Sequence, residues 1–239
     1  MGKCCLCGAE PVKLVKSHII PRSLYGDVIN GEEGPAKLVP HDTDKHPKRS
    51  PMGVYDDSIL CEQCEAKLSP LDDYANEIFR VAEPAPLIVD GEQVGVQITG
   101  IDQKKLKQFF ISLIWRMHIT QHDFFQNVDL GPLEPKFREA ILKGDPDLVS
   151  HVDVVVSRFD HEAAAAFVSP HKMTIDQCNG YRVFFAQHAC WVKVDSQPFP
   201  KPFRAMALNQ NDTLIMLLRD FEDSPELKAL VETLRRRAQ

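Results

Sequence analysis

The stretch DDSILCEQC at residues 56–64, read together with CCLC at residues 4–7, decides the fold that we predict. Both stretches contain a C-x2-C pair, and a two-residue gap lets both sulfurs of a turn face one ion. Four thiolates form the preferred tetrahedral ligand set of structural zinc. The alternative interpretation is that these are ordinary buried or surface thiols. We predict one structural zinc ion bound by the four cysteines of these pairs, Cys4, Cys7, Cys61 and Cys64.

Composition narrows the class of protein. The 239 residues include seven cysteines, an odd number, and the polar start MGKCCLCG lacks the apolar stretch of a signal peptide. No run approaches the roughly 18 apolar residues that cross a bilayer. We therefore expect a cytoplasmic protein without a membrane partner, in which paired cysteines bind metal rather than form disulfides. The net charge of −6 argues mildly against a nucleic-acid partner but does not exclude a local basic patch.

The chain divides at the proline-containing stretch AEPAP, residues 82–86. We expect a zinc-binding domain over residues 1–82 and an α+β domain over residues 87–239, so the predicted class is α+β with an antiparallel sheet covered by helices on one side. Apolar periodicity predicts helices over residues 62–81, 102–120, 134–143 and 225–237. A hairpin is expected around Asp90-Gly91, and further strands over residues 149–158, 172–176, 181–194, 203–207 and 213–218.

Between the cysteine pairs lies SHIIP, residues 17–21. Together with the flanking C-x2-C pairs and DDSILCEQC, this segment resembles the HNH, or ββα-metal, endonucleases. Zinc-bearing members of that superfamily have a C-x2-C pair, then a strand with an Asp-His or His-His pair followed by two apolar residues and proline, then a second C-x2-C pair leading into a helix. The resemblance covers residues 4–80, and longer phrases such as FFISLIWRMHIT are similar to a set of bacterial HNH-like proteins.

The resemblance implies a metal-dependent nuclease that hydrolyses phosphodiester bonds in DNA. In this family a histidine takes a proton from water, and a divalent ion, Mg²⁺ or Mn²⁺, stabilises charge on the leaving oxygen. By position, His18 matches the general base. Asp56 stands where the family has an asparagine that orients this histidine, and Glu65 stands where a helix residue binds the catalytic metal. Ser17 occupies the position of the usual Asp or His metal ligand.

Each of these residues also has an ordinary structural interpretation. His18 could form a hydrogen bond across the knuckle or bind zinc in another arrangement. Asp56 could be a turn residue, and Glu65 could be an exposed residue favoured by the helix dipole. His41 and His46 of the polar insertion are expected to be solvated.

Three functions remain open after the sequence is read. The first is a DNA endonuclease whose residues 87–239 serve targeting, regulation or homo-oligomer formation. The second is a catalytically degenerate HNH-like zinc module that binds nucleic acid or protein without cleavage, which Ser17 and the acidic charge favour. The third is a protein-interaction role with the zinc site as a structural staple.

Overall fold

The computed structural model describes residues 1–28, 37–39, 48–50, 53–159, 167–185, 187–208 and 212–220. The predicted helix over residues 225–237 and the histidines His41 and His46 lie outside these residues. The described helices are α1 (Glu62–Asn76), α2 (Gln103–Ile119) and α3 (Glu134–Lys143). The described strands are β1 (Leu14–His18), β2 (Lys37–Val39), β3 (Lys48–Arg49), β4 (Tyr55–Cys61), β5 (Ala85–Val89), β6 (Glu92–Thr99), β7 (Asp153–Phe159), β8 (Phe167–Val168), β9 (His171–Ile175), β10 (Cys178–Phe185), β11 (His188–Lys193) and β12 (Thr213–Arg219).

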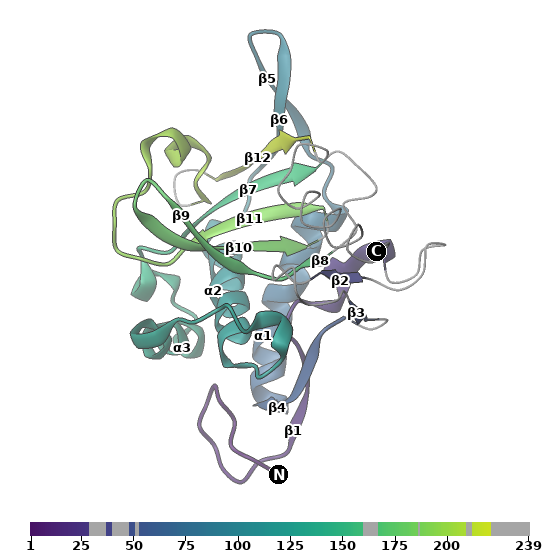
Figure 1. The fold of residues 1–239 in the computed structure, drawn as a ribbon, viewed down its shortest axis with the longest axis vertical. Coiled ribbons are helices and arrows are strands. Elements are labelled where there is room, and N and C mark those ends of the chain that lie inside the picture. Colours follow the sequence, from purple (N-terminus) through teal and green to yellow (C-terminus); the bar gives the residue numbers. More distant parts are fainter. Residues whose placement is uncertain are drawn as a thin grey trace, which may run out of the picture.

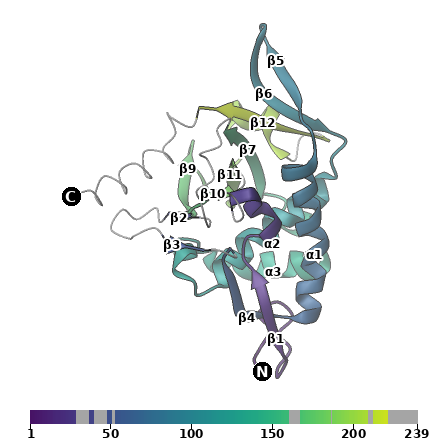
Figure 2. The ribbon, with the colours of Figure 1, turned by 90° about the vertical axis from the view of Figure 1, so that its right-hand side faces the viewer.

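The N-terminal part is a two-stranded antiparallel sheet followed at once by a helix. Strand β1 pairs with β4, and α1 begins at the residue after β4 ends. In the register of this pair, Ser17 lies opposite Asp56 and His18 lies opposite Tyr55. Figures 1 and 2 show these two strands at the N-terminal end of the molecule, beside α1.

Helix α1 occupies most of the range predicted for it. Its buried residues Cys64, Leu68 and Ala75 recur at helical spacing, so one face packs inward. A π-helical turn, Glu77–Val81, continues the helix to the end of the predicted range. Because this turn still buries Ile78 and Phe79, the apolar pattern that predicted a single helix continues through it.

Helix α2 is almost completely buried, and it joins the part that contains the four cysteines to the rest of the chain. Asp102 caps its N-terminus, since the Asp102 side chain accepts a hydrogen bond from Lys105 N. Phe109 and Phe110 pack on Phe185 of β10 at ring-centroid distances of 6.3 and 6.4 Å. One continuous hydrophobic core runs from Cys4 through α1 and α2 to Met216 of β12. The core therefore crosses the boundary predicted between residues 82 and 87.

The large sheet has seven strands in the order β5-β6-β12-β7-β11-β10-β9. The α+β class is confirmed, but the sheet is not purely antiparallel as predicted, because β12 runs parallel to β7. Alternation along β10 separates two packing faces: Val183 and Phe185 belong to the main core, and Phe184 belongs to a small cluster on the other face. Helices α1 and α2 lie on the face of the main core (Figure 2).

Three strand predictions need correction. The single strand predicted over residues 181–194 is instead two antiparallel strands, most of β10 and all of β11. Gln187, the residue just before β11, has a φ of 66°. The strand predicted over residues 203–207 is a 3-10 helix, Lys201–Met206, because Pro200 and Pro202 cannot donate to a ladder. Strand β7 begins only at Asp153, after a 3-10 turn, Pro146–Val149, that covers the start of the predicted strand.

Candidate metal centre and the adjoining hairpin

The four predicted cysteines meet at one point. The Sγ atoms of Cys4, Cys7, Cys61 and Cys64 all lie within 4.8 Å of one another. Sulfurs about 2.3 Å from a tetrahedral zinc ion are about 3.8 Å apart, and the Cys7 and Cys61 sulfurs are separated by 3.9 Å. This donor set fits zinc. Three of the cysteines are buried and Cys7 is exposed, so the cluster lies at the surface of the core.

Local backbone geometry forms the first half of the cluster. Gly8 N donates to Cys4 O, and Gly8 adopts a φ of +78°, a left-handed conformation that glycine adopts without strain. The turn thereby brings Cys4 and Cys7 to the same side. Cys5 points away from the cluster and is exposed, while its backbone N–H donates to Ile59 O of β4. Cys5 is therefore not part of the cluster.

The cluster favours a bound cation electrostatically. Burial raises the pKa of Cys4, but backbone amides of Cys61, Cys7 and Leu6 that donate to its sulfur bring the pKa down to about 7. Burial raises the pKa of Cys64, and its hydrogen bonds with the other three thiols raise the pKa further. Several adjacent thiolates repel one another, so a divalent cation is what allows all four to ionise together. The four residues would hold zinc as a structural ion.

The residue before His18 contacts the first turn of α1. Ser17 is completely buried, and its hydroxyl donates to Glu65 Oε2 at 2.6 Å. The structure therefore brings together the two positions at which the resemblance places ligands of a catalytic metal. Glu65 is half-buried rather than an ordinary solvated residue. A hydroxyl is a weaker ligand than a carboxylate, so Glu65 supplies the main charge at this point.

His18 lies at the end of β1 and is half-buried. Its ring meets the ring of Tyr55 edge-on at a centroid distance of 6.1 Å. The cluster of possible metal ligands among the described residues consists of the four cysteines, which gives no support to His18 as a zinc ligand. The histidine instead lies next to the Ser17–Glu65 contact along the chain.

Asp56 has hydrogen-bond partners that the sequence did not predict. It lies opposite Ser17 in register, and successive residues of a strand point to opposite faces. Its carboxylate accepts hydrogen bonds from Ser58 Oγ at 2.6 Å and from Thr120 Oγ1 at 2.7 Å. Burial raises the pKa of Asp56, but these hydrogen bonds outweigh burial and lower the pKa below its usual value. Asp56 thus connects β4 to the end of α2.

Arg116 on α2 is a residue of this site that the sequence did not reveal. The structure buries Arg116 completely. Its guanidinium donates to both carboxylate oxygens of Asp72 on α1, at 2.7 and 2.9 Å, and to the backbone carbonyl of His18 at 3.0 Å. The signal that could have found it is its place on the apolar face of α2, three residues after Leu113 and seven after Phe109.

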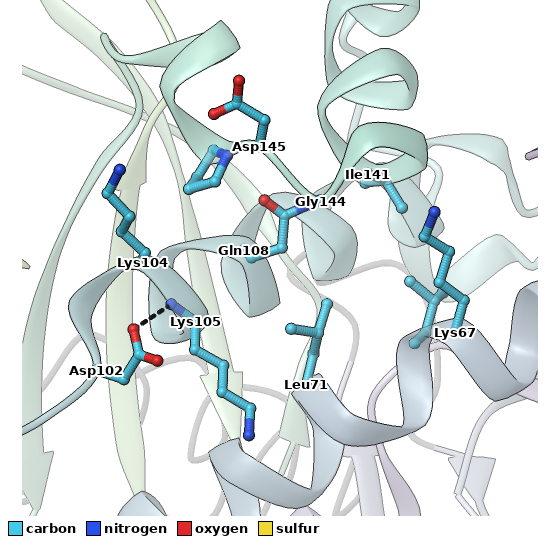
Figure 3. A pocket seen from close by; sticks show the side chains of 11 residues that line it. Lys67, Leu71, Asp102, Lys104, Lys105, Gln108, Ile141, Gly144 and Asp145 are labelled. Carbon is cyan, nitrogen blue, oxygen red and sulfur yellow. Dashed lines mark hydrogen bonds between the residues drawn. The ribbon is translucent and has the colours of Figure 1, made fainter.

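A separate hollow of about 370 Å³ lies where α1, α2 and α3 meet (Figure 3). On α1 it is lined by Lys67, Leu68 and Leu71, and none of the residues that line it belongs to β1 or β4. Figure 3 shows lysine side chains around its rim, and Lys104 there pairs with Asp147 at 2.7 Å. The hollow is therefore distinct from the end of β1, where His18 lies.

Comparison with protein-family models, with curated proteins and with solved structures finds no match to this chain. In the part of the chain that the structure describes, none of the helices has the length and apolar character needed to span a bilayer.

Proposed function

We propose that this chain is a metal-dependent, HNH-like nuclease that hydrolyses phosphodiester bonds in DNA. The observation that supports the proposal most is the 2.6 Å contact between Ser17 and Glu65. It places a carboxylate from the first turn after the second cysteine pair beside the residue that precedes His18. Chain order, the β1–β4 pair and the adjoining α1 agree with the resemblance seen in the sequence.

The residues offer one carboxylate and one histidine for this chemistry. Mg²⁺ commonly keeps several waters and binds through one or two carboxylates plus substrate phosphates, so Glu65 suffices as an anchor. A bound Mg²⁺ or Mn²⁺ would stabilise charge on the leaving oxygen. His18 would accept the proton of the attacking water, since an imidazole takes and releases protons near neutral pH. Ser17 would hold the Glu65 carboxylate in place through its hydrogen bond.

The test is nicking of supercoiled plasmid by the zinc-loaded protein in Mg²⁺ or Mn²⁺. We expect cleavage by the wild type, and loss of cleavage in His18→Ala and Glu65→Gln. Glu62→Gln is the matched control, because Glu62 lies in the same first turn of α1 and is exposed. His171→Ala, in β9, controls for loss of a histidine elsewhere. Equal cleavage by wild type and His18→Ala would contradict the proposal.

A second candidate is a zinc module that binds nucleic acid or protein without cleaving it. The same contact favours this candidate. Ser17 has a hydroxyl at the position where the family normally has a metal ligand, and that hydroxyl already donates a hydrogen bond to the Glu65 carboxylate. Protein that fails to nick plasmid but shifts its mobility in a salt-dependent way would support this candidate. Absence of both cleavage and binding would reject both DNA functions.

A further inference from the structure

We propose that Arg116 and Thr120, at the C-terminal end of α2, are positioning residues. They hold the paired strands β1 and β4 in place at the end where His18 lies. This inference rests on the proposed function for its catalytic meaning, but its structural part can be tested without cleavage. The two residues are four positions apart, so they lie on the same face of the helix end. Arg116 binds the last residue of β1, and Thr120 binds Asp56 of β4.

The Arg116 contact is specific in geometry. Its planar guanidinium forms a fork-to-fork pair with Asp72, at 2.7 and 2.9 Å, so the orientation of the third hydrogen bond to His18 O is fixed. The side chain of Arg116 is fully buried, and that of Asp72 is 17% exposed. Water therefore competes little for these hydrogen bonds, and the carbonyl of His18 is held to both α1 and α2.

Stability alone is a poor explanation for this arrangement. A buried ion pair often contributes no more than well-packed apolar residues of the same size, because both charges lose their hydration. Here Arg116 Nε is also buried without a hydrogen-bond partner among the described residues, which is a further cost. What the pair does provide is a fixed position for the backbone of His18 relative to α1, the helix that carries Glu65.

The Thr120 contact fixes the opposite strand. The Thr120 hydroxyl donates to Asp56 Oδ2 at 2.7 Å, and Asp56 lies opposite Ser17 in register. Next to this pair, Ile19 N donates to Val54 O at 3.0 Å and continues the contact between the two strands. Loss of the Arg116 contact or of the Thr120 contact should therefore let β1 and β4 separate at this end. The hydrogen-exchange rate of the Ile19 amide would report that separation directly.

The variants are chosen so that the fold survives. In Arg116→Met combined with Asp72→Leu, both charges are replaced by apolar side chains of similar size, which avoids an unpaired buried charge. Thr120→Val removes the hydroxyl and keeps the shape. Arg116→Lys and Thr120→Ser retain a donor and should preserve part of the effect. Lys104→Met is the control on α2, because it removes only an exposed ion pair with Asp147.

The first readout is amide hydrogen exchange in zinc-loaded protein. We expect Ile19 to exchange about tenfold faster in the double variant and measurably faster in Thr120→Val, while amides of β10 and β11 keep their rates. Unchanged Ile19 exchange, or equal acceleration across the whole protein, would overturn the proposal. Because this readout needs no cleavage, it stands even if the chain proves not to be a nuclease.

The second readout applies if the wild type nicks plasmid. Misplacement of a catalytic group by about 1 Å can cost about 100-fold in rate, so the double variant should lose kcat by that order. Its KM should stay within about twofold, because neither residue is proposed to bind DNA. A raised KM with unchanged kcat would overturn the positioning role and assign Arg116 and Thr120 to substrate binding.

Discussion

Single substitutions at the adjacent residues Cys4 and Cys5 should have different effects on stability. Cys4→Ser removes one of four clustered sulfurs, whereas Cys5→Ser changes an exposed side chain that lies outside the cluster. A metal ion bound at the cluster would tie together positions 7 and 61, which are 54 residues apart in the chain. We therefore expect Cys4→Ser to destabilise the protein strongly and Cys5→Ser to leave its stability unchanged.

The magnitude follows from the length of chain that the cluster closes. A cross-link over 54 residues removes unfolded-state entropy worth about 4 kcal/mol at 25 °C by the loop-closure relation. That is a large part of the roughly 5–15 kcal/mol that stabilises an ordinary domain. For a chain of this size it corresponds to a fall in Tm of about 8–16 °C.

The assay is urea or thermal unfolding of both variants and the wild type, each with zinc and after chelation. Chelation should lower the Tm of the wild type and of Cys5→Ser to that of Cys4→Ser, and should change Cys4→Ser much less. If Cys4→Ser and Cys5→Ser unfold together, or if chelation leaves the wild-type Tm unchanged, the cluster does not bind a structural metal and the reasoning is refuted.

Three further predictions concern single positions. Ser17→Asp places a carboxylate against Glu65, so it should lower the free energy of unfolding without divalent ions and regain stability with Mg²⁺; a loss that Mg²⁺ does not reverse would contradict this. The pKa of Asp56 is lowered in the folded state, so the ionised carboxylate stabilises the fold. This stabilisation is fully present above the pKa of an aspartate in the unfolded chain, near 4, and is lost as pH falls through the pKa of Asp56 in the folded state. Asp56→Asn should therefore cost stability at pH 7, and the difference from the wild type should shrink toward pH 3 in urea unfolding. Gly180→Ala should lower stability by about 1–3 kcal/mol, because its Cβ would lie 2.6 Å from Trp191 Nε1; an unchanged urea midpoint would show that the sheet yields.

Local sequence signals predicted the elements that depend on local interactions. Asp102 marks the start of α2 through its side-chain hydrogen bond, and Gly144 ends α3 in a left-handed conformation. The four cysteines were predicted because their chemistry leaves few other uses. The turn between β10 and β11 was not predicted, since Gln187 carries a positive φ without the glycine or asparagine that usually signals one.

Long-range contacts were beyond the sequence. The partner of Arg116 lies 44 residues away and that of Thr120 lies 64 residues away, so no spacing rule connects them. An arginine on an apolar helix face indicates that some buried acceptor exists, but not that the acceptor is the carbonyl of His18. Likewise, the neighbouring positions of Ser17 and Glu65 were implied by the resemblance and were not derivable from periodicity.

X-ray absorption at the zinc edge of the natively purified protein tests the metal centre most directly. We predict about one zinc per chain, with four sulfur neighbours at about 2.3 Å and no nitrogen neighbour. A metal-free protein, or a zinc ion bound by nitrogen and oxygen, would contradict the assignment of Cys4, Cys7, Cys61 and Cys64 as the zinc ligands that join the N-terminal turn to the start of α1.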